Sequence, residues 1–201
     1  MPKRDKLLAE LQGEDRYGVL LMAQMDAVPE TLQFVVVTTQ MDEAAGGLRD
    51  QGRYIIRALG VREHRVSVGI FGNLRLLDDH PLLYEYNTPP TGLFFRGTPD
   101  DANELVLDIF QGYASTFGPW RQIPTYFNLN RPLLDLVSGG GDLLGEMPKP
   151  LAERLDKVLQ QHRLETKVME GKRTEPKLKV LLLDDSYVVA LDFSIDELGK
   201  V

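Results

Sequence analysis

The sequence predicts an α+β fold in which a mainly antiparallel sheet packs against two principal amphipathic helices. Short strand-like segments follow one another closely in the first half of the chain and return at its end, and the strongest helical patterns lie between them. Segregation of strands from helices favours an antiparallel sheet over alternating βαβ units. An apolar run broken by paired aspartates occurs at residues 76–80 and again at residues 182–186, and each copy predicts a β-hairpin.

Most of the chain before Gly97 is predicted to form strands. Residues 3–12 are the exception, because leucines recur on one side of a short helical pattern. The adjacent β-branched residues Val35, Val36 and Val37 favour a strand that is buried on both faces. Strands are expected at residues 17–24, 32–40, 65–70, 74–77, 82–86 and 92–96.

Two segments of this half fit more than one conformation. Each glycine within residues 42–53 weakens a helix by about 1 kcal/mol relative to alanine, so this segment is either a weak helix or a mobile loop. Residues 54–59 fit a helix or a strand.

The strongest helical pattern begins at Thr98. Threonine is a good cap, Pro99 suits the first helical position, and the two aspartates that follow stabilise the positive end of the helix dipole. The apolar face of this helix predicts packing against the sheet, and it consists of Ala102, Leu105, Val106, Ile109, Phe110, Tyr113 and Phe117.

The rest of the chain is predicted to contain a second principal helix and a final hairpin. The helix runs from Pro150 to near Arg163 and has a narrower apolar stripe. A short helix is expected before it at residues 132–137. The final hairpin pairs residues 178–183 with residues 187–193.

The simplest organisation is one α+β domain over residues 1–201. The Gly139-Gly140-Gly141 run is flexible enough to divide the chain, so the alternative is a larger β-rich unit at residues 1–137 and a smaller helix-and-hairpin unit at residues 142–201. This run lacks the lysine of a GxxxxGK[ST] loop, and it therefore predicts a connection rather than a phosphate site.

Composition argues against several classes of function. The chain has 201 residues, no cysteine and a net charge of −7. Without cysteine it forms no disulfide and no thiolate metal site, which fits a cytoplasmic location. The acidic balance argues against nucleic acid as a partner, and the basic residues between positions 167 and 179 alternate with glutamates as in a solvated connection. Apolar runs are far shorter than the roughly 20 residues that cross a bilayer, so no membrane partner is expected.

Four polar residues form the best candidate for catalysis: Asp78, Asp79, His80 and Glu85. Carboxylate and imidazole groups hold divalent metal ions or divide general acid and general base roles, which would make the protein a small hydrolase or a metal-dependent enzyme. Adjacent side chains on a strand point to opposite faces, however, and aspartates are common in turns. The turn interpretation is favoured, and no catalytic residue, metal ion or cofactor is assigned.

An aromatic segment after the strongest helix, residues 117–127, is the preferred functional feature. Aromatic rings and arginine bury a large area with few rotatable bonds, and they carry much of the binding energy at protein interfaces. The candidates in this segment are Trp120, Arg121, Tyr126 and Phe127. The predicted strands before the helix add a second wall, formed by Tyr84, Tyr86, Phe94, Phe95 and Arg96.

This surface predicts a non-enzymatic protein-binding or assembly protein with a protein partner in the cytoplasm. In the competing interpretation the same rings close the core beneath the helix. Exposure of Trp120 and Arg121 would support binding, and burial of both would argue against it. A homodimer is compatible with a sheet edge or with the stripe of the second helix, and the sequence favours neither.

Overall fold

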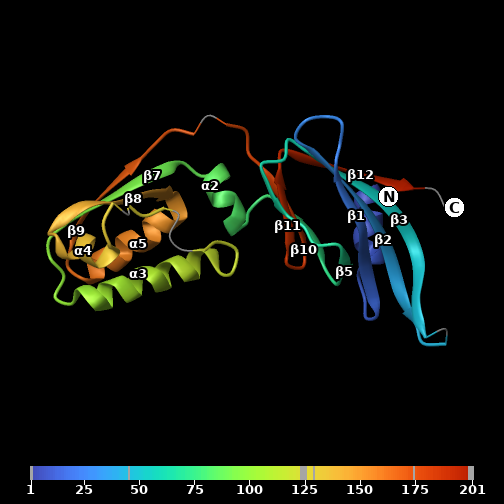
Figure 1. Cartoon of the computed structure of the whole chain (residues 1–201), viewed down its shortest axis with the longest axis horizontal. Coiled ribbons are helices and arrows are strands. Elements are labelled where there is room, and N and C mark those ends of the chain that lie inside the picture. Colours follow the sequence, from blue (N-terminus) through green and yellow to red (C-terminus); the bar gives the residue numbers. More distant parts are fainter. Residues whose placement is uncertain (1, 45, 123–125, 129, 174, 199–201) are drawn as a thin grey trace. The chain divides into compact units, whose positions relative to one another are not determined.

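The computed structural model describes residues 2–44, 46–122, 126–128, 130–173 and 175–198. Within these residues it confirms the α+β class, with three antiparallel sheets (Figure 1). The two predicted principal helices are α3 (Ala102–Phe117) and α5 (Lys149–Gln161), and they pack on each other. Contacts divide the chain into two compact units: unit 1 is Met1–Asp79 with Lys177–Val201, and unit 2 is His80–Pro176.

Unit 1 contains two sheets. The five-stranded sheet has the order β12 (Asp192–Leu198), β3 (Gly47–Leu59), β2 (Thr31–Asp42), β1 (Arg16–Met25) and β5 (Gly69–Phe71). The four-stranded sheet has the order β4 (Glu63–Arg65), β11 (Ser186–Ala190), β10 (Lys179–Leu183) and β6 (Leu74–Leu77). Alternate side chains of each strand point to the same face of its sheet, and such side chains from both sheets form one core. Its members include Leu20, Phe34, Ile56, Leu181 and Val188.

The valine run lies on β2, as predicted. Val36 and Val37, which point to opposite faces of the strand, are both buried, whereas Val35 is partly exposed. Residues 54–59, which fit a helix or a strand, are strand. Of the uncertain segment at residues 42–53, Asp42 ends β2 and residues 47–53 are strand, because residues 47–59 form β3 along the whole length of β2.

The predicted first helix is confirmed as α1 (Lys3–Glu10), which places Leu7 in the core of unit 1. Its ammonium groups reach the last strand: Lys3 Nζ lies 2.6 Å from Asp196 Oδ1, and Lys6 Nζ lies 2.6 Å from Glu197 Oε1. The hydrogen bond from Lys3, and after it that from Arg57, lowers the pKa of the Asp196 carboxyl below its ordinary value. These ion pairs join the two ends of the chain.

Unit 2 contains a three-stranded sheet with the order β8 (Gly141–Pro148), β7 (Pro90–Arg96) and β9 (Glu165–Glu170). Helices α3, α4 (Leu133–Ser138) and α5 share a second core with this sheet. The predicted apolar face of α3 supplies Leu105, Ile109, Tyr113 and Phe117 to that core, whereas Phe110 is exposed. The predicted short helix is α4, and the second principal helix begins one residue before Pro150.

Helix α3 begins later than predicted, because its cap is Asp101 rather than Thr98. The Asp101 carboxylate accepts hydrogen bonds from the backbone amides of Asn103 at 2.8 Å and Glu104 at 3.1 Å. A carboxylate at this position satisfies two amides that have no partner within the helix and also interacts favourably with the dipole. Asp100 and Asp101 therefore precede the first turn of α3, whereas the sequence predicted that they would lie within it.

The first aspartate phrase does not form the predicted hairpin, and the strand expected at residues 82–86 is wrong. After β6 the chain forms the 3₁₀ helix η1 (Pro81–Leu83) and then α2 (Tyr84–Asn87). His80 Nδ1 accepts a hydrogen bond from the Leu82 amide at 3.3 Å and so caps this turn. Pro81 also fixes a helical φ, which outweighs the strand-like apolar residues that follow.

The second aspartate phrase does form the predicted hairpin, between β10 and β11. Asp184 adopts the left-handed φ of +48° that the turn requires. Its carboxylate accepts hydrogen bonds from the backbone amides of Gly72 at 2.7 Å and Asn73 at 3.0 Å. Beyond Ala190 the chain leaves this sheet, and β12 pairs with β3 instead of extending the hairpin.

Residues 65–70 were expected to form one strand, and this prediction is wrong. The segment divides into the ends of two short strands, β4 and β5, which belong to different sheets. The break lies between Arg65 and Gly69. There the Ser67 amide donates a hydrogen bond to Ser186 Oγ at 3.0 Å, and Gly69 has a φ of +150°.

Strands β8 and β9 were not predicted. The Gly139-Gly140-Gly141 run lies inside unit 2, where it ends α4 and starts β8. The number of domains stays a prediction, because contacts define compact units rather than independent folding. Among the helices that the structure describes, none is long and apolar enough to span a bilayer.

Candidate binding site

The structure assigns the four predicted catalytic residues to different settings. Asp78 and Asp79 end the first segment of unit 1, and His80 and Glu85 belong to unit 2. His80 caps η1, and its ring packs edge-on against Trp120 with 5.0 Å between the ring centroids. Within the residues that the structure describes, no group of three or more histidine, aspartate or glutamate side chains is arranged to hold a metal ion.

Glu85 is instead the centre of a polar cluster with two of the predicted binding residues. The Tyr126 hydroxyl donates a hydrogen bond to Glu85 Oε2 at 2.9 Å, and Arg121 Nη2 lies 3.6 Å from the same oxygen. Burial, and after it the charge of Glu85, raises the pKa of the Tyr126 hydroxyl far above its ordinary value. The phenol therefore stays protonated as the donor, and the carboxylate is held in one orientation.

Residues of the predicted aromatic surface differ in exposure. Tyr126 and Phe127 are buried in the core of unit 2 with Tyr113 and Phe117, and the Tyr126 and Phe117 rings stack at 5.6 Å. Trp120 is partly exposed. The Arg121 side chain is only 17% exposed, which suits a residue that positions Glu85 more than one that contacts a partner. Residues 123–125 of the aromatic segment lie outside the described residues.

The residues of the second predicted wall lie in two separate places, on α2 and at the end of β7. Tyr84 and Tyr86 lie on α2 and are partly exposed, and the Tyr84 ring packs 6.2 Å from Phe117. Arg96 is exposed at the end of β7, where it lines a separate hollow with Glu165 and Lys167 of β9. Arg96 therefore lies at the opposite end of β7 from Pro90.

An open hollow of about 370 Å³ lies beside Glu85, and we call it the β8 hollow. Its lining comes from α2, the start of β7 and the end of β8, and includes Glu85, Thr88, Pro90, Tyr126, Glu146 and Pro148. The two glutamates are exposed, whereas Tyr126 and Pro148 are buried against the core. The hollow thus combines two exposed carboxylates with apolar rings, of which those of Tyr126 and Pro148 are buried.

Gly145 explains how Tyr126 reaches this hollow. Gly145 forms an antiparallel bridge with Phe127, and a Cβ atom at Gly145 would lie 2.0 Å from the Tyr126 carbonyl oxygen. Only glycine lets these backbones approach so closely. Sequence reasoning missed Gly145, Glu146 and Pro148 together, because β8 was taken for a connection. Leu143 and Leu144 before the glycine and Met147 shortly after it are the apolar signal that could have identified the strand.

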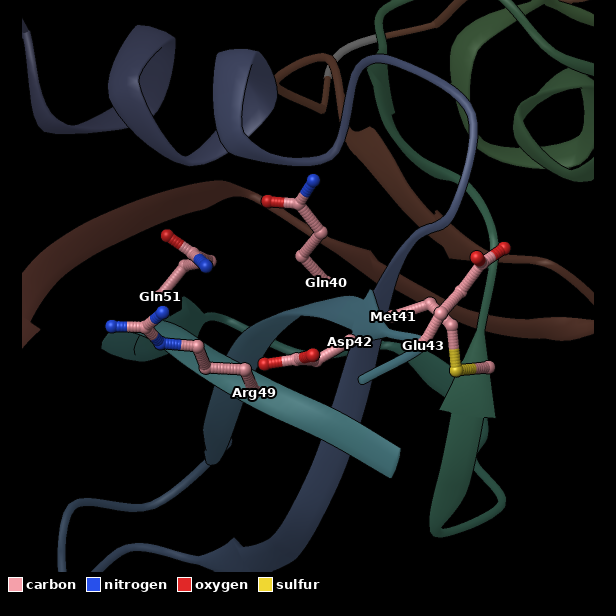
Figure 2. A pocket seen from close by; sticks show the side chains of 6 residues that line it. All are labelled: Gln40, Met41, Asp42, Glu43, Arg49 and Gln51. Atoms are coloured by element: carbon pink, nitrogen blue, oxygen red, sulfur yellow. The ribbon is translucent and has the colours of Figure 1, made fainter. Parts of the chain in front are cut away.

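A second hollow, of about 260 Å³, lies at the end of the β2–β3 hairpin in unit 1. Figure 2 shows Gln40, Asp42, Arg49 and Gln51 on one side of the hairpin, while Met41 and Glu43 project to the other. This lining is polar and of mixed charge and has no aromatic floor. It fits a solvated hairpin end better than a ligand site.

Comparisons with known proteins identify no relative of this chain. A scan against protein-family models and searches of curated proteins and of solved structures find no match.

Proposed function

We propose that this protein is a non-enzymatic binding or assembly protein and that the β8 hollow receives a segment of a partner protein. The partner segment carries a lysine or arginine next to an apolar side chain. One observation supports this proposal above the others: two exposed carboxylates, those of Glu85 and Glu146, line the same hollow as Tyr126 and two prolines.

The chemistry of the hollow favours a cationic partner. The Glu85 side chain is 46% exposed although Tyr126 and Arg121 hold it, so one side of the carboxylate faces solvent. A fixed carboxylate binds a cation with little further loss of conformational entropy. The prolines and the ring edge bury the apolar part of the same segment, and aromatic residues of this kind are enriched at interfaces.

The aromatic surface extends the proposed contact. Trp120 is partly exposed and packs on His80, and Tyr84 and Tyr86 lie on the same short helix as Glu85. A partly exposed ring on a rigid support is the kind of residue on which binding energy concentrates. Arg121 acts here as a positioning residue for Glu85.

Binding is tested with three variants of the full chain. Partners are captured from extract of the native cell with the unchanged protein and with Glu85→Gln, Glu146→Gln and Trp120→Ala. Glu153→Gln is the matched control, because Glu153 is an exposed glutamate on α5 outside the hollow. A captured protein is then purified and titrated against each variant.

The expected result is a partner whose affinity falls about tenfold or more with each of the three variants and is unchanged with Glu153→Gln. The fall for the two glutamine variants should also diminish at high salt, because the contact is electrostatic. Equal binding by all variants would place the partner elsewhere and would contradict the proposal.

A further inference from the structure

Helices α3 and α5 border a hollow of about 210 Å³, which we call the α3–α5 groove. It is separate from the β8 hollow, because the two share no lining residue. The helices approach closely at Gly112, where a Cβ atom would lie 2.9 Å from Leu155 Cδ2 and 3.7 Å from Arg154 Cγ. The alkyl chain of Arg154 therefore lies against α3 and supports the guanidinium group in the groove.

Two cationic side chains line this groove, those of Arg154 and Lys157. They are three residues apart on α5 and so are neighbours on the helix surface. Both are exposed, and within the described part of the chain neither takes part in a hydrogen bond or an ion pair. Their positive charges are therefore available to a ligand.

The nearby carboxylates interact with other groups. Among the described residues, Asp108 is the one carboxylate that lines the groove, and its Oδ2 atom lies 2.8 Å from His162 Nε2. Glu153 is one turn before Lys157 on α5, but its Oε1 atom lies 4.0 Å from Lys149 Nζ instead. The groove thus has two unpaired cations and a single carboxylate that has a partner.

We infer that the α3–α5 groove binds a phosphoryl group, as free phosphate or as a phosphate monoester. Such a group carries a charge of about −1.5 to −2 at pH 7, which matches two cations, whereas a carboxylate would match only one. Arg154 can donate two parallel hydrogen bonds to phosphate oxygens, and Lys157 acts as a point charge. Gln111 and Gln161 line the same groove and supply amide donors for the remaining oxygens.

The test is a titration of the full chain with inorganic phosphate, followed by nuclear magnetic resonance at pH 7 and constant ionic strength. The Gly112 backbone amide and the side-chain amides of Gln111 and Gln161 should shift and saturate. The net charge of −7 weakens attraction for any anion, so the expected dissociation constant is about 1–10 mM. Arg154→Gln and Lys157→Gln should each raise it about tenfold.

Asp108→Asn changes the groove in the opposite direction. It removes the negative charge from the lining and keeps a side chain that can hydrogen-bond to His162, so it should lower the dissociation constant about threefold. Lys172→Gln and Arg75→Gln are the matched controls, because both residues are exposed and lie outside the groove. These two variants should bind phosphate as the unchanged chain does.

A parallel titration with phenyl phosphate distinguishes the two sources of the phosphoryl group. Leu107 is 60% exposed and lies one turn before Gln111 on α3, where it can contact the ring of an ester. Tighter binding of phenyl phosphate would identify a monoester, and equal binding would identify free phosphate. Two results would overturn the inference: no saturable shift in the groove up to about 50 mM of either probe, or unchanged affinity in the folded Arg154→Gln and Lys157→Gln variants.

Discussion

At the scale of single residues, the Asp184 carboxylate shows how an acidic turn acts in this protein. Asp184 lies in the turn between β10 and β11, and its carboxylate accepts hydrogen bonds from the backbone amides of Gly72 and Asn73 in the connection between β5 and β6. The neighbouring Asp185 takes part through its backbone, since its carbonyl oxygen accepts a hydrogen bond from Arg65 at 3.0 Å. The two adjacent aspartates thus have different structural roles, and neither role involves catalysis.

Asp184→Ala should therefore destabilise unit 1, whereas Asp185→Ala should not. Removing the carboxylate leaves two amides without their partner, and alanine tolerates a φ of +48° less well than aspartate. The expected loss is about 1–3 kcal/mol of unfolding free energy, with the lower end favoured because the turn is exposed. Urea denaturation followed by circular dichroism measures both variants. Equal midpoints would refute the assigned role.

At the scale of elements, the start of α3 offers a direct comparison between a predicted cap and the observed one. Asp101→Ala should lower the unfolding free energy by about 1 kcal/mol, because two amides of the first turn lose their acceptor. Thr98→Ala is the control, since Thr98 precedes the helix by several residues. Thermal unfolding of both variants measures the loss of unfolding free energy. A larger loss for Thr98→Ala would indicate that Thr98 caps the helix, as the sequence predicts.

Elements were predicted correctly where one periodicity dominated a long segment. Helices α3 and α5 and strand β2 each carry a consistent apolar pattern. The apolar residues of that pattern are the ones that these elements bury in the two cores. The segment at residues 82–86 carries a strand-like pattern, but Pro81 and the His80 cap determine a helical turn there. Strand β8 was missed because glycines at both 141 and 145 resemble a loop. Periodicity encodes neither a local cap such as that of His80 nor the close approach of distant backbones at Gly145.

The candidate site was predictable only in part for the same reason. The sequence singled out Glu85, Trp120, Arg121 and Tyr126, which the structure gathers around one carboxylate and one ring pair. Glu146 joins them only because β8 pairs with β7, a contact between distant parts of the chain. Side chains that come from an unrecognised strand cannot be placed in a site from sequence alone.

At the scale of the whole molecule, electrostatic pairs near the chain ends substitute for covalent links in a protein without cysteine. Lys3 and Lys6 of α1 pair with Asp196 and Glu197 of β12, and Arg57 of β3 shares Asp196. The first helix, an internal strand and the last strand are thereby held together. Exposed pairs are individually weak, so their collective effect should appear mainly in the response of the fold to pH and salt.

Acid should weaken the fold through Asp196, whose pKa Lys3 and Arg57 hold below the ordinary value of 3.8. A group with a depressed folded-state pKa stabilises the fold fully above its unfolded pKa, and this contribution is lost as pH falls through the folded pKa. Asp196→Asn should therefore lower the thermal midpoint at pH 7 and flatten the decline below about pH 4. Asp185→Asn, an exposed turn aspartate of the same unit, should keep the full acid decline. Melting curves from pH 7 to pH 3 measure the difference, and parallel declines in both variants would show that Asp196 does not link acid to the stability of unit 1.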